Sequence, residues 1–82
     1  MTPAFRELDT VVLAHDIPEA GLRAGDLGAI VMVHAPDRFE VESATASGKT
    51  QALLPLAKSD LRPVSDNDLL AVRPTTNRWG TA

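Results

Sequence analysis

The 82-residue sequence contains no cysteine and no tyrosine, and only two phenylalanines and one tryptophan. Without cysteine, the chain has no disulfide bonds, no thiolate metal ligands and no cysteine nucleophile. Aliphatic side chains and methionine must therefore fill most of the core. A chain of this length buries one modest core, and a large cofactor would take up most of that interior. We expect a single small domain with no cofactor.

Long apolar runs and clustered positive charges are also lacking. No stretch approaches the roughly 20 apolar residues that a membrane-spanning helix needs. The N-terminal "MTPAFRELD" lacks the basic and then apolar order of a secretory signal. Eight basic and eleven acidic residues give a net charge of −3, and the basic residues are spread singly, whereas nucleic-acid binding relies on clustered Lys and Arg. We expect a soluble cytoplasmic protein with no membrane contact, for which nucleic acid is not the favoured partner.

Short apolar or alternating segments, separated by Gly, Pro and Asp turns, predict five strands. In "RFEVES", Phe39 and Val41 alternate with charged residues, so this strand has one buried and one wet face. Pro55 in "KTQALLPLA" indicates an edge strand or a bulge. The predicted strands are 9–14, 29–34, 38–43, 49–57 and, after one tight turn, the end of 58–64.

The segment "HDIPEAGLRAGD", residues 15–26, is too rich in Gly and Pro for a strand or a long helix. We interpret it as a structured loop in which Ile17 and Leu22 can point inward. Its glycines and the one that follows are candidates for positive φ, and they let the chain reverse sharply into the second strand. The structural turn residues are Gly21, Gly25, Asp26 and Gly28.

Together these elements predict a mainly β fold, a small SH3-like five-stranded barrel over residues 9–64. Closing a small sheet on itself hides strand edges that would otherwise invite aggregation. Residues 1–8 form an N-terminal lead-in, and residues 65–82 form a C-terminal extension and tail. Residues 65–73 fit either a short helix, capped by Ser65 or Asp66, or an additional strand, and the sequence does not decide between them.

The order of motifs from Glu7 to Val64 resembles a family of small uncharacterised bacterial proteins with an SH3-like fold. The resemblance lies in "ELDTVVLAHDIPEAGLRAGDLGAIVMV", "FEVE" and "LLPLAKSDLRPV". It implies a fold, but no defined activity and no catalytic residues.

Two looser likenesses concern the glycine turn alone. Gly25, Gly28 and Ile30 have the spacing of the Gly-x-x-Gly-x-Val motif of ribosomal and transcription-factor domains, which carry basic residues near the loop. Here the loop carries Asp16, Glu19 and Asp26 against a single arginine. The turn is also similar to the Gly-Asp-x-Gly turn in the beta-subunit barrel of nitrile hydratases, which is a likeness of fold only.

His15-Asp16 and His34 are the candidates for proton transfer or metal binding. A His–carboxylate pair can orient an imidazole as a general base, but no Ser or Cys stands in a recognisable nucleophile setting. A metal ion needs three or four ligands, and His15, Asp16 and His34 with Asp37 could supply them only if the loop folds over. We expect no catalytic, cofactor-binding or metal-binding residues.

The acidic residues around the first strand and the long loop have two interpretations. They could form a patch for a basic partner, or they could accept backbone N–H bonds within turns. The second is favoured for Asp26. The acidic residues in question are Asp9, Asp16, Glu19 and Asp26.

The spacing of Gly21, Gly25 and Gly28 matches neither the dinucleotide-binding fingerprint nor the P-loop.

Surplus apolar residues favour an interaction surface. Leu53 and Leu54 are adjacent on a predicted strand, so they cannot both face one interior. We expect a non-catalytic interaction module, which binds another protein or a second copy of itself, or an accessory protein that acts beside an enzyme or toxin. The alternative is a nucleic-acid-binding barrel of the Gly-x-x-Gly-x-Val kind. The candidate partner surface comprises Ile17, Pro18, Glu19, Leu22, Leu53 and Trp79.

Overall fold

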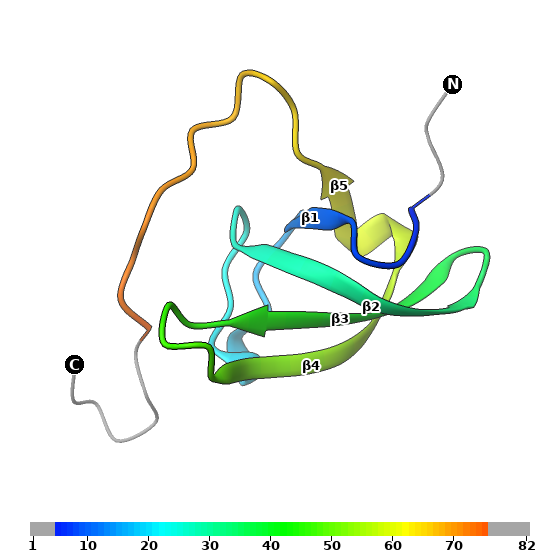
Figure 1. Ribbon diagram of the computed structural model, residues 1–82, viewed down its shortest axis with the longest axis horizontal. Helices are drawn as coiled ribbons and strands as arrows, with labels where there is room; N and C mark the ends of the chain where they lie inside the picture. Colours follow the sequence, from blue (N-terminus) through cyan, green and yellow to red (C-terminus); the bar gives the residue numbers. More distant parts are fainter. Residues whose placement is uncertain (1–4, 76–82) are drawn as a thin grey trace.

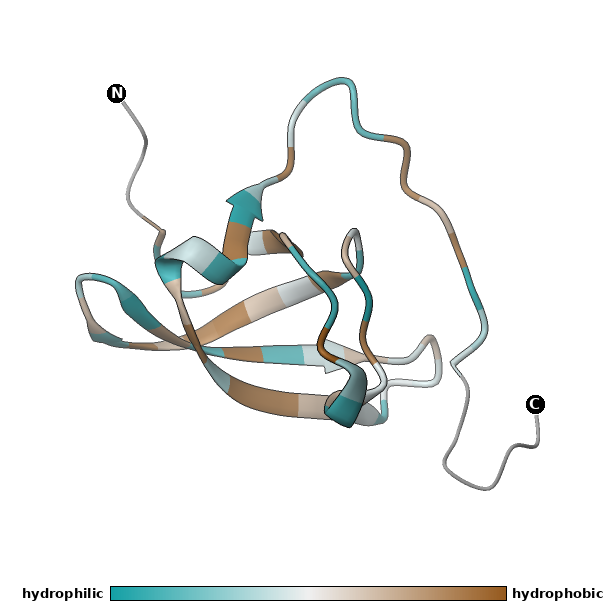
Figure 2. Ribbon diagram, turned by 180° about the vertical axis from the view of Figure 1, so that it is seen from behind, coloured by the Kyte–Doolittle hydropathy of each residue, from teal (hydrophilic) through white to brown (hydrophobic). Residues whose placement is uncertain are grey.

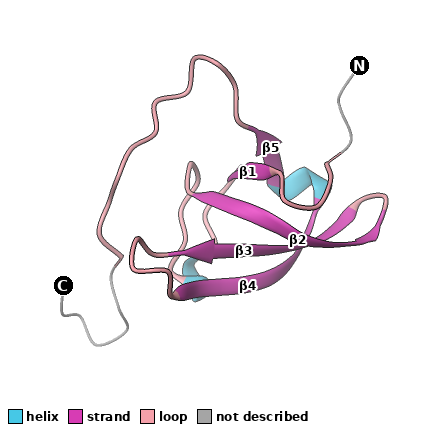
Figure 3. Cartoon of the chain, viewed as in Figure 1, coloured by secondary structure: helices cyan, strands magenta, loops and turns pink. Residues whose placement is uncertain are grey.

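The computed structural model describes residues 5–75, and within them the prediction of a mainly β fold is confirmed (Figures 1 and 3). Five antiparallel strands form one sheet in the order β4-β3-β2-β1-β5. A long loop follows the first strand, and a single helical turn precedes the last. The strands are β1 (Thr10–Leu13), β2 (Leu27–Ala35), β3 (Arg38–Ala44), β4 (Thr50–Ala57) and β5 (Leu61–Pro63), with the 3-10 turns η1 (Pro18–Ala20) and η2 (Lys58–Asp60).

The predicted closure of the barrel is wrong, because β4 and β5 lie at opposite ends of the strand order and do not pair with each other. The edge position indicated by Pro55 is confirmed for β4. Both end strands contain a proline, Pro55 in β4 and Pro63 as the last residue of β5. Proline has no N–H to donate to a further strand. The sheet is therefore open, and each of its end strands lacks one donor that a further strand would need.

The core gathers buried side chains from all five strands and from loop 15–26, and Figure 2 colours these elements by hydropathy. Phe39 and Val41 point into the core from β3, as their alternation predicts, at 2% and 3% exposure. Phe5 packs edge-to-face on Phe39, with ring centroids 5.6 Å apart and planes at 86°, a favourable aromatic geometry. Each strand contributes at least one of the buried apolar residues, which are Val11, Val12, Leu13, Ile17, Leu22, Ile30, Phe39, Val41, Ala52 and Leu61.

Loop 15–26 is held to the core by its two apolar side chains. Ile17 and Leu22 exchange backbone hydrogen bonds of 2.9 and 3.1 Å across η1, and both are buried. The expectation that they point inward is confirmed. Their assignment to an exposed partner surface is wrong, because a loop this rich in Gly and Pro keeps its place by burying them.

The glycines of this turn serve two different purposes. Gly21 and Gly25 have the expected positive φ, at 71° and 93°. Gly28 does not, so that expectation is wrong for it. It lies in β2, where a Cβ would be 2.7 Å from Cγ1 of Val41 and 3.2 Å from the carbonyl oxygen of Glu42. Gly28 is needed because β2 and a β3 side chain pack too closely for any larger residue.

Residues 64–75, which we call the strap, leave β5 and arch back to the β3–β4 turn (Figure 1). The strap contains neither a helix nor a strand, so both interpretations of residues 65–73 are wrong. Asp68 accepts hydrogen bonds from the N–H and hydroxyl of Ser65, and the Asp68 N–H donates to the Ser65 carbonyl. This closes one isolated turn, after which the chain runs on in an irregular path.

We predict that Gly28→Ala lowers the free energy of unfolding by about 1–3 kcal/mol through overpacking. Val41→Ala removes the Cγ1 atom that the new methyl group would meet, so the double variant should lose less than the sum of the single losses. Gly25→Ala is the control: its Cβ would meet nothing within 4 Å, and its loss should come from backbone strain. Urea unfolding measures all four variants, and additive losses for Gly28→Ala and Val41→Ala would contradict the packing argument.

Candidate interaction site

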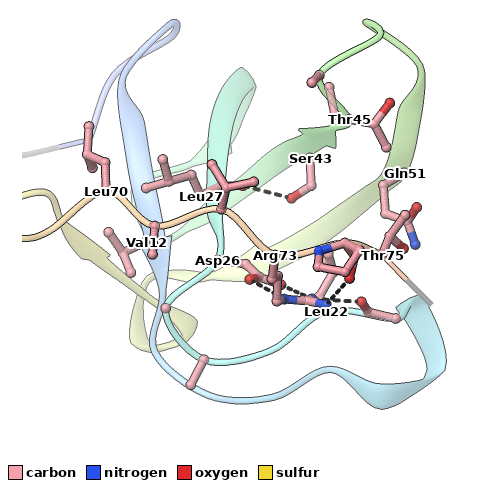
Figure 4. Close-up of a pocket in the computed structure, with 18 of the residues that line it drawn as sticks. Val12, Leu22, Asp26, Leu27, Ser43, Thr45, Gln51, Leu70, Arg73 and Thr75 are labelled. Atoms are coloured by element: carbon pink, nitrogen blue, oxygen red, sulfur yellow. Dashed lines mark hydrogen bonds and ion pairs between the residues drawn. The ribbon is translucent and has the colours of Figure 1, made fainter. Parts of the chain in front are cut away.

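An open groove of about 780 Å³ lies between the strap and the sheet. One wall is the strap itself, and the other comes from loop 15–26, the start of β2 and the β3–β4 turn (Figure 4). Leu22 and Leu27 form the apolar part of the sheet side together with several alanines. Ser43 is satisfied within this wall, because its hydroxyl donates to the Leu27 carbonyl at 3.1 Å.

Arg73 anchors the far end of the strap (Figure 4). Its Nε and Nη2 donate to the two carboxylate oxygens of Asp26, and Nη2 also donates to the Gly21 carbonyl at 3.1 Å. Two parallel N–H···O bonds from one guanidinium are the strong form of this ion pair. They hold the pKa of Asp26 below its ordinary value, and the N–H of Arg23 adds to the effect. The arginine thus ties the strap to the loop before β2.

Arg62 anchors the near end. Its Nη1 and Nη2 donate to the carboxylate of Asp68 at 2.9 and 3.1 Å. The hydrogen bonds from Arg62, and then that from the Ser65 N–H, lower the pKa of Asp68. The strap is therefore attached to the domain at both ends through bidentate arginine–carboxylate pairs.

Between these two anchors, the strap presents apolar side chains to solvent. Leu69, Leu70 and Val72 are 94%, 70% and 99% exposed. Among the described residues, no backbone hydrogen bond joins residues 69–75 to the rest of the chain. Exposed apolar side chains grouped in this way are typical of interaction sites. We call residues 69–72 the apolar segment.

The predicted partner residues differ in exposure, since Ile17 and Leu22 are buried. Pro18 and Glu19 are exposed on η1, and Leu53 is exposed on β4. The expectation that Leu53 and Leu54 face opposite ways is confirmed, since Leu54 packs against the core. Trp79 lies outside the described residues.

The acidic residues act mainly within turns. Asp9, Asp16 and Asp26 each accept a backbone N–H, from Arg6, Ala24 and Arg23, at 2.8–2.9 Å. The interpretation of Asp26 as a turn residue is confirmed, and its second partner, Arg73, was not foreseen. Nothing in the sequence pointed to that contact, because the two residues are 47 positions apart and Arg73 lies in a segment of undecided structure.

The two histidines stand apart, each on its own carboxylate. Nε2 of His15 lies 2.6 Å from Asp60, and Nε2 of His34 lies 2.9 Å from Glu40. Nδ1 of His15 also faces the Asp16 carbonyl at 3.0 Å. Because both partners of His15 are acceptors, both ring nitrogens can donate only when the ring is protonated. Within residues 5–75, no group of three or more His, Asp or Glu side chains is placed to hold a metal ion.

Comparison with known families gives one match. Residues 7–63 fit the model of a domain of unknown function, DUF4926. The chain belongs to this family. The match ends at Pro63, the last residue of β5, so the strap lies beyond the part that defines DUF4926. No curated protein and no solved structure matched the chain. In the described part, no helix is long and apolar enough to cross a bilayer.

The pair formed by His15 and Asp60 predicts a pH-dependent contribution to stability. The hydrogen bond to Asp60 raises the pKa of His15 above its ordinary 6.5, and the same bond lowers that of Asp60 below 3.8. The contribution is therefore fully present between about pH 4 and 6.5 and fades as the pH rises through the folded-state pKa of His15.

Urea unfolding at pH 5.5 and 8.5 measures this effect. His15→Gln should reduce stability more at the lower pH, and this difference should be smaller in an Asp60→Asn background, where only the Asp16 contacts still raise the pKa of His15. His34→Gln is the matched control for loss of a surface imidazole. Equal losses from His15→Gln at both pH values would contradict the prediction.

The arginine anchor predicts where the strap loosens. Arg73→Gln should lower the heteronuclear ¹⁵N NOE of residues 69–75 while leaving the core amide shifts unchanged, because the far end of the strap is then released. Asp26→Asn should act in the same direction. Arg62→Gln is the matched control: it should loosen the near end, residues 64–68, first. Unchanged NOE values in Arg73→Gln would show that the ion pair does not hold the strap.

Proposed function

We propose that this DUF4926 protein is a non-catalytic interaction module, and that its apolar segment binds another protein. The observation that supports this function is the exposure of Leu69, Leu70 and Val72 on a segment anchored at both ends by ion pairs. Burying each such side chain gains roughly 1.5–3 kcal/mol. Three of them supply a substantial share of the free energy of a specific complex.

The backbone of the apolar segment adds a second kind of contact. Its N–H and C=O groups have no backbone partners among the described residues. An extended segment in this state can pair with a partner's backbone while its side chains enter pockets. Because the anchors at Asp68 and Arg73 already restrict the segment, less conformational entropy is lost on binding than for a free tail.

The alternative, a nucleic-acid-binding barrel, has no specific observation in its favour. In the Gly25–Gly28 turn, the carboxylate of Asp26 faces the chain's own Arg73, and Arg62 is likewise paired with Asp68. Neither arginine is available for a phosphate without first breaking an internal pair. We propose no catalytic role, because among residues 5–75 neither histidine ring hydrogen-bonds a Ser or Thr hydroxyl that it could activate.

Site-specific photocrosslinking in the cells that produce the protein tests the proposal. A photoreactive amino acid at position 70 should form a discrete adduct with a protein. The same residue at position 53, which is also an exposed leucine (53%), is the matched control and should form none. The adduct should disappear when Leu69→Asp is added, because a charge in the segment opposes its burial. Equal labelling from positions 70 and 53 would contradict a role for the apolar segment.

A further inference from the structure

We propose that the protein bound by the apolar segment is a second copy of this chain, with each strap entering the groove of the other molecule. This inference rests on the proposed function and names the partner of the same site. The result is a two-fold dimer in which one molecule supplies both halves of the contact: the projecting segment and the groove that receives it.

The groove matches the apolar segment in polarity. Leu27, at 41% exposure, and the exposed alanines at positions 24, 44 and 46 form the apolar part of its sheet side, and the buried Leu22 lies beneath them. The charged groups nearest this wall, Asp26 and Arg73, already neutralise each other. Residues 69–72 carry no charge at all. An uncharged apolar segment therefore meets a wall whose polar members, Ser43, Thr45 and Gln51, are also uncharged, and no ionised side chain has to be buried unpaired.

The chain does not fill this groove with its own apolar segment. Asp68 is fixed to Arg62 on one side of the segment, and Arg73 is fixed to Asp26 on the other. Only four residues lie between the anchors, and although they border the groove, their leucine and valine side chains are 70–99% exposed. The anchors thus keep the segment at the mouth of the groove, where a second molecule can cover it.

The area involved favours reciprocal docking over a single contact. A buried Leu or Val side chain removes on the order of 100 Å² from water, so one segment and the wall it covers account for roughly 600 Å². That is below the roughly 1,200 Å² at which specific interfaces begin. In a two-fold arrangement the same contact occurs twice, which reaches this threshold. A second copy is the partner that doubles the contact without any new surface.

Sedimentation equilibrium of the full chain tests the oligomeric state. An interface at the low end of the size range should give a dimer with a dissociation constant in the micromolar range. Leu70→Asp on the segment and Leu27→Asp on the groove wall should each weaken dimerisation at least tenfold. Leu53→Asp, the exposed leucine of β4, is the matched control and should leave it unchanged. Circular dichroism confirms that each variant is folded.

The absence of cysteine from the chain allows a second test of the geometry. A Leu70→Cys protein is mixed with an Ala46→Cys protein under mild oxidation, so that a mixed disulfide reports the segment of one molecule in the groove of another. This disulfide should form much faster than the one between Leu70→Cys and Leu53→Cys. It should also slow down in the presence of excess wild-type protein, which competes for the same dimer.

A chain that remains monomeric at roughly 1 mM would overturn the inference. At that concentration, a dimer is missed only if its binding free energy is weaker than about −4 kcal/mol. A dimer that is lost with Leu53→Asp but kept with Leu70→Asp would also overturn it, because the contact would then use the face of the sheet. In a monomer, a position-70 adduct with a different protein would still uphold the proposed function. A monomer without any such adduct would refute both.

Discussion

Asp26 joins three parts of the molecule that are distant in sequence. Its carboxylate accepts the N–H of Arg23 within the loop and the guanidinium of Arg73 from the strap, and its carbonyl accepts the N–H of Leu13 at the end of β1. The groove exists because these contacts converge at one residue. Without the Asp26 carboxylate, the far end of the strap would lose its ion pair and keep only the hydrogen bond from Arg73 to the Gly21 carbonyl.

The family match and the regular secondary structure end at the same residue, Pro63, and the strap begins after it. The part that matches DUF4926 contains the sheet, the core and the two helical turns, so it includes every long-range backbone pairing that the structure describes. The strap adds no regular structure and is attached through side chains alone, at Arg62–Asp68 and Arg73–Asp26. A domain built in this way can keep its fold while the appended segment determines what it contacts.

The sequence predicted the strands well because their signals are local. Alternation placed Phe39 and Val41, and Pro55 indicated the edge. Closure of the sheet could not be predicted, since it depends on whether two distant strands meet. The site was missed for a related reason. Its anchor joins Arg73 to Asp26, which are 47 positions apart. The apolar segment has the composition of a helix or a strand, but it forms neither because it does not pack against the core.

The prolines of the end strands limit how this protein can associate. An open sheet with free edges would ordinarily be able to add strand after strand and grow into fibres. Pro55 and Pro63 remove donors from β4 and β5, which makes such growth unfavourable at either end. A bent sheet whose two end strands each carry a proline is therefore protected against strand-by-strand polymerisation without being closed into a barrel.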